Sequence, residues 1–321
     1  MAFHGIMAVR DEGDIIAQVL AHVMSWLDSL LVYDTGSRDG TWEIVRELAA
    51  RDRRVVAMGG EPVVFQNGLR AMIFDRARAS YRDGDWVARL DGDEFYHVSP
   101  REFVRERVDR REGRVFAQMY DFLLTRAEVA AWERGEESPS ARSRPIEERR
   151  RRYVVQEFPE PRLFRYRRWM KWPAWSYVPL CGGLPARARV PVRHYRWRDP
   201  DQAAARCALR RAMRAAGART GPHWDLQDWR DWLADDADPR LLTHAPGAAL
   251  PEPGLTNHLA RGWRRGAQRA AYGLGLARAA DLVLRGFDPA FRPEPECRGD
   301  GARVSFARPH ASTTGEAALR T

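Results

Sequence analysis

The chain has 321 residues, 44% of them hydrophobic, which is enough for one large core or two modest ones. Its formal net charge is +9 and its pI is about 10.0, yet Lys171 is the only lysine and the arginines are spread throughout. This spread indicates a compositional bias rather than a nucleic-acid-binding patch, and no basic and aromatic nucleic-acid module is present. No run of 18 apolar residues could span a membrane.

The spacing of the cysteines and the first residues of the sequence indicate the cellular compartment of the protein. Cys181, Cys207 and Cys297 are widely spaced, which fits reduced thiols better than a metal site or a disulfide framework. The sequence begins directly on an apolar run, without a signal-peptide pattern. We therefore expect a cytoplasmic protein.

The first 60 residues alternate between predicted strands and helices. Phe3–Val9 and Ser29–Asp34 have the apolar pattern of strands, and residues 15–27 between them carry an apolar helix face. Trp42–Arg51 shows helical spacing, and Arg54–Met58 is a third short strand. This order predicts a parallel sheet with right-handed crossovers, in which ligands bind beyond the carboxyl ends of the strands.

Acidic residues stand at those strand ends. A further apolar run, Trp86–Leu90, ends abruptly in Asp91, Gly92, Asp93 and Glu94. Asp91 and Asp93 are two residues apart, so on an extended chain they point the same way and can hold a divalent cation. Gly92 lets the backbone approach a ligand closely. The acids expected at the same edge from the other loops are Asp11, Glu12 and Asp34.

Three motifs, in this order, carry a resemblance to a known family. They are Val9-Arg10-Asp11-Glu12, Asp34-Thr35-Gly36-Ser37-Arg38-Asp39-Gly40-Thr41 and Leu90-Asp91-Gly92-Asp93-Glu94-Phe95. They resemble the family-2 glycosyltransferases of GT-A fold, whose usual forms are Asn-Glu, Asp-x-Gly-Ser-x-Asp-Gly-Thr and Asp-Ala-Asp-Glu. Asp11 stands where the family often has Asn. The likeness covers residues 1–125 well and continues more weakly to about 215.

The resemblance implies a fold and a domain organisation. The fold would be α/β, of the GT-A type, with a central, mostly parallel sheet flanked by helices and a C-terminal helical extension. The catalytic domain would cover residues 1–215, with a nucleotide-sugar-binding half (1–112) and an acceptor-side half (113–215). A helical extension (216–292) and a disordered tail (293–321) would follow.

The resemblance also implies an inverting, metal-dependent transfer from a nucleotide-diphospho-sugar. By similarity, Asp34 would contact the base or ribose, Asp91 would lie near the ribose or metal, and Asp93 would bind the metal. A Mn²⁺ or Mg²⁺ clamp would stabilise the charge that develops on the leaving nucleoside diphosphate. The residues expected at the nucleotide-sugar are Val9, Arg10, Asp11, Glu12, Asp34, Gly36, Ser37, Arg76, Asp91, Gly92 and Asp93.

His194 closes the predicted strand Val190–Arg193. In some GT-A enzymes a histidine after the last core strand completes the metal shell, which would make Asp91, Asp93 and His194 the metal set. Imidazole with carboxylates suits Mn²⁺ better than Mg²⁺. A structural, hydrogen-bonded histidine is the open alternative, with Arg196 and Arg198 as other phosphate partners.

The sequence leaves the catalytic base and the acceptor open. A carboxylate or histidine must take the proton of the acceptor hydroxyl. Three acids are candidates, each of which could instead be structural: Asp121 after the strand Val115–Tyr120, Glu157, and Glu94 beside the metal pair. The tryptophans of residues 168–175 could form an acceptor surface or a corner of the core. The acceptor could be a glycan, lipid-linked or a small molecule.

The remaining segments are described by charge. Residues 134–152 are highly charged and predict a mobile loop, either a lid over the donor or a plain solvated insertion. Residues 200–216 predict a helix, and residues 255–285 one or two basic helices. Those basic helices could rest on the inner face of an anionic membrane, although packing against the catalytic domain is favoured.

Three rival functions stay open. A nucleotidyltransferase shares nucleotide, metal and α/β sheet, but residues 9–14 are acidic where it needs a Gly-rich loop bearing Lys or Arg. A non-catalytic nucleotide-sugar-binding homologue would keep the fold without turnover. A charge-driven binder of nucleic acid or membrane surface would show a steep salt dependence and no affinity for nucleotide-sugars.

Overall fold

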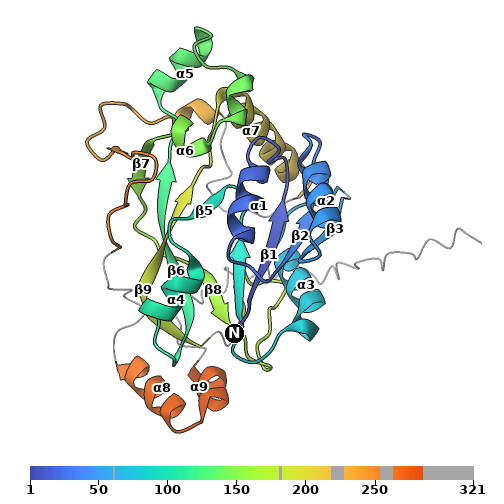
Figure 1. Ribbon diagram of the computed structural model, residues 1–321, viewed down its shortest axis with the longest axis vertical. Coiled ribbons are helices and arrows are strands. Elements are labelled where there is room, and N and C mark those ends of the chain that lie inside the picture. The colour runs from blue at the N-terminus through green and yellow to red at the C-terminus, as the bar shows by residue number, and fades with distance from the viewer. Residues whose placement is uncertain (61, 181–182, 218–227, 254–262, 285–321) are drawn as a thin grey trace, which may run out of the picture. The chain divides into compact units, whose positions relative to one another are not determined.

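A mixed sheet of ten strands, with helices on both faces, forms the centre of the described chain (Figure 1). The computed structural model describes residues 1–60, 62–180, 183–217, 228–253 and 263–284. The strands are β1 (Phe3–Val9), β2 (Ser29–Asp34), β3 (Val55–Gly59), β4 (Trp86–Leu90), β5 (Glu94–Tyr96), β6 (Glu112–Phe122), β7 (Arg152–Val155), β8 (Glu160–Arg165), β9 (Leu184–His194) and β10 (Leu242–Thr243). The helices are α1 (Ile16–Met24), α2 (Thr41–Arg51), α3 (Asn67–Ala77), η1 (Arg78–Ser80), α4 (Pro100–Arg107), α5 (Arg126–Glu133), η2 (Pro139–Ser143), α6 (Ile146–Arg149), α7 (Pro200–Ala215), η4 (Trp229–Trp232), α8 (Trp263–Gly273) and α9 (Ala277–Leu284).

The predicted parallel arrangement of the first strands is confirmed. The sheet order is β10-β7-β6-β8-β4-β1-β2-β3, and β3, β2, β1 and β4 run parallel to one another. The other half mixes directions, since β8 is antiparallel to β4 and β6 while β9 is parallel to β6. Val9 pairs with Asp34 and Met7 with Leu90, so β1, β2 and β4 end at the same edge. The predicted α/β class with a central sheet and flanking helices is confirmed.

Each face of the sheet has its own core because alternate strand residues point to opposite faces. Helix α1 places Ile16, Val19 and Leu20, all at most 2% exposed, on the face that also receives Phe3 and Met7 of β1. This confirms the apolar helix face predicted for residues 15–27. On the opposite face, Phe74 of α3 packs with Phe164 and Trp172 around Ile6. Trp172 therefore belongs to a corner of the core.

The charged segment 134–152 is not the unstructured loop that its composition predicts. It forms η2 and α6, and the guanidinium groups of Arg149 and Arg150 are buried. Arg149 Nε donates to Glu137 Oε1 at 3.0 Å and Arg150 Nη1 to Glu137 Oε2 at 3.0 Å. The prediction of an unstructured loop is wrong because Arg149 and Arg150 pair with Glu137 inside the protein, whereas other charged residues of the segment, such as Arg134 and Glu136, are exposed.

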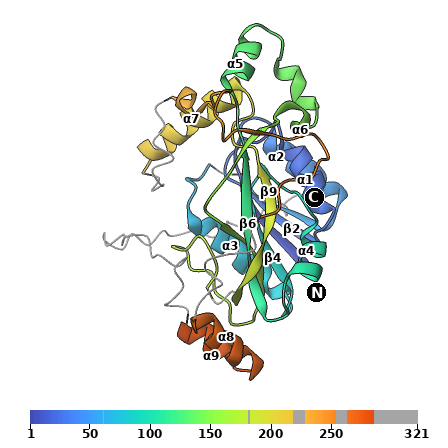
Figure 2. The ribbon, with the colours of Figure 1, turned by 90° about the vertical axis from the view of Figure 1, so that its left-hand side faces the viewer.

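The basic helices α8 and α9 lie beside each other at the end of the sheet opposite α5, α6 and α7, as two views show (Figures 1 and 2). Arg265 of α8 is buried and hydrogen-bonds to Glu112, and Arg269 Nη2 donates to Asp109 Oδ2 at 2.9 Å. These contacts favour packing against the protein; contact with a membrane stays a prediction. None of the described helices is long and apolar enough to cross a membrane.

Two predictions fall on residues that are not described. The disordered tail predicted for residues 293–321 lies outside the described residues, as do residues 255–262 and 285 of the predicted basic helices. The predicted division of the chain at residues 215 and 292 stays a prediction.

Candidate functional site

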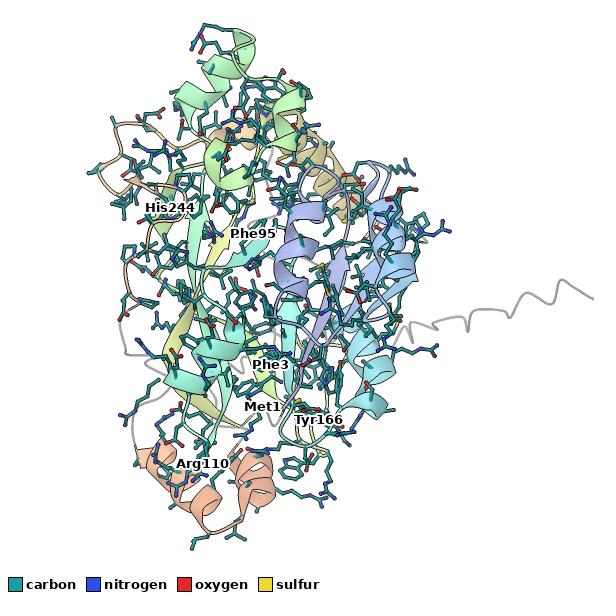
Figure 3. The ribbon with its side chains drawn as sticks, in the orientation of Figure 1. Met1, Phe3, Phe95, Arg110, Tyr166 and His244 are labelled. Atoms are coloured by element: carbon teal, nitrogen blue, oxygen red, sulfur yellow. The ribbon has the colours of Figure 1, made fainter. Side chains whose placement is uncertain are left out.

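The loops that follow β1 and β2 are hydrogen-bonded to each other at the carboxyl edge of the sheet. Thr35 N and Oγ1 both donate to the carbonyl oxygen of Val9, at 3.0 and 3.1 Å. Arg10 Nη1 donates to the carbonyl oxygen of Thr35 at 2.8 Å, and Glu12 N donates to Thr41 Oγ1 at 2.8 Å. The structure thus brings the first two motifs into direct contact. In Figure 3, Phe95 of the third motif lies nearer this edge of the sheet than Met1 and Tyr166 do.

Asp34 orders its own loop. Its carboxylate is completely buried, and Oδ1 accepts the backbone N–H groups of Gly36 and Ser37 at 2.8 and 2.9 Å. Gly36 has a φ of +92°, and a Cβ there would lie 2.6 Å from Cα of Pro62, so only glycine fits. Asp34 therefore gives the loop its shape, and its predicted contact with the nucleoside stays a prediction.

Asp11 has an unusual backbone conformation. Its φ of +52° makes it the one non-glycine residue with positive φ in the described part of the chain. Asn and Asp are the side chains that tolerate this left-handed region best. Asp11 Oδ1 accepts the N–H of Arg38 at 2.8 Å, and Asp11 N donates to Ser37 Oγ at 2.9 Å. Half-burial raises the pKa of Asp11 above its usual value.

Glu12 is buried between two arginines from the second half of the chain. Arg198, which is completely buried, donates from Nη2 to Glu12 Oε2 and from Nε to Asp14 Oδ2, both at 2.6 Å. Arg206 of α7 hydrogen-bonds to the other oxygen of Glu12. Of the two arginines considered as phosphate partners, Arg198 is thus fully engaged inside the protein. The side chain of Arg196 is 26% exposed, and its Nη2 lies 3.8 Å from Asp121 Oδ2.

His194 lies between two carboxylates. Its Nδ1 is 2.8 Å from Asp121 Oδ1 and its Nε2 is 3.5 Å from Asp93 Oδ2. Burial opposes the charged imidazolium, but Asp93 and Asp121 outweigh it and raise the pKa of His194 well above its usual value. Burial likewise opposes ionisation of Asp93, but His194 and Arg206 hold the pKa of that carboxyl well below its usual range.

Asp91 faces away from this pair and toward arginines. Arg70 Nη2 of α3 donates to Asp91 Oδ1 at 2.6 Å, and Arg162 Nη1 of β8 lies 3.2 Å from Asp91 Oδ2. Arg162 also hydrogen-bonds to Glu94, which is buried. Burial and the neighbouring Asp91 raise the pKa of Glu94 well above its usual value. Glu94 is therefore part of a buried ion-pair network.

Two of the three predicted metal ligands could hold a divalent cation, which requires His194 to give up its imidazolium proton on binding. Asp93 offers a carboxylate and His194 an imidazole, and Asp121 holds the other ring nitrogen of His194, as carboxylates do behind metal-bound histidines. Asp91 does not fit, because both of its oxygens are paired with arginines. Among the residues that the structure describes, no three histidine, cysteine, aspartate or glutamate side chains lie together as a ready-made metal set.

Positive charge gathers next to Asp93. Arg206 Nη1 donates to Asp93 Oδ2 and to the carbonyl oxygen of Arg196, both at 2.9 Å. The guanidinium of Arg210 lies over the ring of Trp197, 5.4 Å from its centroid. Burial and the nearby charges of Arg206 and Arg196 lower the pKa of Arg210 to about 10. A phosphate group bound here would relieve this repulsion.

A cavity of about 770 Å³ is lined in part by Asp121. Two of the three candidate bases, Asp121 and Glu157, line it, and Glu94 does not. Asp121 accepts a hydrogen bond from Gln156 Nε2 at 2.6 Å. Burial raises its pKa, but His194 and Arg196 outweigh burial and hold the pKa of Asp121 below its usual value.

The structure leaves some predicted residues apart or gives them other neighbours. Arg76 lies in the last turn of α3, is exposed, and is on the turn farthest from the carboxyl edge. A Cβ at Gly92 would lie 3.1 Å from Glu12 Cγ and 3.2 Å from Val9 Cγ1, so this glycine lets two loops approach each other. None of the tryptophans in residues 168–175 lines the cavity.

Several residues that contact the predicted acids were missed by sequence reasoning. Arg70, Arg162 and Arg206 come from α3, β8 and α7 and each bonds to a motif carboxylate. Arg162 carried a signal, because it lies in the weaker part of the family resemblance. Arg70 and Arg206 carried none in a chain so rich in arginine.

Comparison with known proteins finds limited similarity, and no family model matches the chain. A TPR repeat-containing protein of Synechococcus elongatus is 30% identical over 110 residues, which are 34% of this chain and 25% of that protein. The chain thus spans about a quarter of the length of this curated relative.

Solved structures with partial likeness include sugar-transferring enzymes. Mannosyltransferase PcManGT from Pyrobaculum calidifontis, in complex with GDP-Man and Mn²⁺, is 12% identical with a TM-score of 0.36, covering 90% of this chain and 88% of that one. Glucosyl-3-phosphoglycerate synthase from Mycobacterium tuberculosis is 19% identical with a TM-score of 0.26, covering 50% and 56%. Scores of this size carry no inference about activity, which has to rest on the site.

Proposed function

We propose that the chain is a glycosyltransferase that moves a sugar from a nucleotide-diphospho-sugar to an acceptor hydroxyl, with the help of a divalent cation and with inversion at the sugar carbon. One observation carries the proposal: His194 links Asp93, beside the arginines, to Asp121, on the cavity wall. The row of side chains Asp93, His194 and Asp121 thus connects the arginine-rich region, where an anion could bind, with the open cavity. The motif order, which resembles family-2 glycosyltransferases, supports the same reading.

Asp93, His194, Asp121 and the neighbouring arginines each have a role in this proposal. Asp93 and His194 would hold the cation, which supplies positive charge to the leaving diphosphate. Asp121 keeps the His194 ring in one orientation through its hydrogen bond to Nδ1. Arg196 and Arg210 are placed to pair with phosphate oxygens, for which arginine has the right geometry.

The loops after β1 and β2 would hold the nucleoside. Their rigidity comes from Asp34 and Asp11, whose carboxylates accept backbone N–H groups of the same loops. A loop fixed in advance binds a nucleoside without a further loss of backbone entropy. The base of the reaction is then Asp121 or Glu157, because both line the cavity where an acceptor hydroxyl can enter.

A thermal-shift panel tests the proposal. UDP, GDP, dTDP and CDP are each added with and without Mn²⁺, and one of them should raise the Tm only when Mn²⁺ is present. Ligand binding stabilises the native state by RT ln(1 + [L]/Kd), so even micromolar affinity is visible. No shift with any nucleotide would refute the proposal.

Two further results separate the rivals. Release of nucleoside diphosphate from the matching nucleotide-sugar supports glycosyl transfer, whereas release of inorganic pyrophosphate from a nucleoside triphosphate and a sugar phosphate supports a nucleotidyltransferase. Binding without either reaction supports a non-catalytic homologue. The cytoplasmic location stays a prediction in each case.

A further inference from the structure

The side chains that line the cavity beside Asp121 indicate which class of acceptor it can bind. It lies between β7 and the segment that carries η4, and its volume of about 770 Å³ is within the range of small-molecule sites. The wall formed by this segment is fixed to the sheet side, because Ala234 N donates to the carbonyl oxygen of Leu124 at 3.1 Å and Arg126 N donates to that of Ala234 at 3.1 Å. The cavity is therefore built by ordered backbone on both sides.

Aromatic side chains stand exposed at this cavity. Trp232 is 41% exposed and Phe158 is 80% exposed, and both line it together with the buried Trp197. Two exposed aromatic rings at one cavity offer apolar faces that a ligand can cover. The face of an aromatic ring can pack against the C–H groups of a sugar ring. Neighbouring carboxylates can accept hydrogen bonds from the hydroxyl groups of that sugar.

The charge of the lining is negative. Five carboxylates and two guanidinium groups line the cavity. Arg240 Nη2 donates to Asp238 Oδ2 at 2.7 Å, which neutralises that acid, and Asp121 pairs with His194. The three other acids form no ion pair within the described part of the chain; they are Glu157, Asp231 and Asp235. Arg196 is the other cation, and its Nη2 lies 3.8 Å from Asp121 Oδ2.

We infer that this cavity binds the acceptor as a neutral or amine-bearing sugar and discriminates against an anionic one. An acceptor carrying a carboxylate or phosphate would be repelled by the three carboxylates of Glu157, Asp231 and Asp235, and this repulsion would favour neutral acceptors over anionic ones. An amine would instead pair with them. The inference rests on the proposed function only in naming the bound sugar an acceptor; the binding itself needs no donor.

The test is ligand-observed saturation-transfer NMR on the full chain without nucleotide. The probes are the methyl glycosides of glucose, galactose and mannose, each in neutral, 2-amino and uronate form. The neutral or amino forms should give saturation transfer and the matched uronates should give none. Stronger signals from the uronates, or no signal from any probe, would overturn the inference.

Matched variants locate the binding. Trp232→Ala should abolish the signals, whereas Trp175→Ala, which removes a tryptophan that is 55% exposed and outside the cavity lining, should leave them unchanged. The double variant Asp231→Asn/Asp235→Asn should gain signals from the uronates. Unchanged signals in Trp232→Ala would overturn the placement in this cavity.

The two proposals fail separately. A Mn²⁺-dependent nucleotide shift without glycoside binding overturns only the inference on the cavity. Glycoside binding that depends on Trp232, without any nucleotide shift, upholds the cavity as a sugar site and refutes the glycosyltransferase.

Discussion

Arg196 and Arg198 are two residues apart, yet the structure gives them opposite roles, and a pair of substitutions separates these roles. Arg198 is completely buried and binds Glu12 and Asp14, whereas the Arg196 side chain is 26% exposed at the cavity. Arg198→Met roughly keeps the volume but removes the ion-pair partner of Asp14 and leaves Glu12 with Arg206 alone. Breaking a buried ion pair by removing one partner costs about 3–5 kcal/mol.

The expected loss is measurable by thermal and urea unfolding. In a domain of this size each kcal/mol shifts the Tm by a few degrees, so Arg198→Met should lower the Tm by about 6–20 °C. Arg196→Met should cost less than Arg198→Met, about 1 kcal/mol, because Arg196 is partly exposed and its contact with Asp121 is long, at 3.8 Å. Arg196→Met should instead weaken the Mn²⁺-dependent binding of the nucleotide.

The pH dependence gives a second check on Arg198→Met. Burial already raises the pKa of Glu12 to about 7 in the intact protein. Without Arg198, Glu12 can become neutral by taking up a proton, so the deficit in stability should shrink as the pH falls below neutrality. A Tm within a degree or two of the parent protein, combined with lost nucleotide binding, would refute the structural role and make Arg198 a ligand residue.

Three further substitutions test other parts of the site. Asp93→Asn should remove the Mn²⁺-dependent nucleotide shift and cost about 1–3 kcal/mol of stability in the metal-free protein; an unchanged shift contradicts the assignment of the cation to Asp93. Asp11→Asn should be nearly neutral in urea unfolding, whereas Asp11→Val should cost about 1–3 kcal/mol at its positive φ; equal stabilities would contradict that backbone conformation. Burial opposes ionisation of Asp199, but Arg142 and the N–H of Gln202 hold its pKa below the usual value. Its contribution is therefore present above the unfolded pKa of about 3.9 and is lost as the pH falls through the folded pKa, so the deficit of Asp199→Asn at pH 7 should disappear in acid; a constant deficit would contradict the ion pair.

Local patterns predicted the elements that position the site. The apolar runs Phe3–Val9 and Ser29–Asp34 coincide with β1 and β2, because buried parallel strands are read directly from continuous apolar residues. The acids that follow them reach one edge because parallel strands end there. Asp121 shows the limit, since the predicted strand stopped one residue short of it, whereas β6 extends to Phe122.

Which arginines bind the acidic residues of the motifs could not be predicted from the sequence. Asp91 is bound by Arg70 and Arg162, and Asp93 by Arg206, which lie 21, 71 and 113 residues away in sequence. Composition offers dozens of arginines, and only the packing of α3, β8 and α7 selects these three. The same reason explains Arg149 and Arg150 in segment 134–152, where charge indicated solvent exposure but pairing with Glu137 buries both guanidinium groups.

Arg206 also bears on how the proposed metal and nucleotide would affect each other's binding. Arg206 already donates to Asp93, so a cation that binds Asp93 has to compete with a guanidinium 2.9 Å away. A metal ion alone therefore gains little at this site. A diphosphate changes the balance, because it attracts both the cation and the displaced guanidinium group. Metal and nucleotide should consequently bind with positive coupling, and linkage requires each to raise the affinity of the other by the same factor.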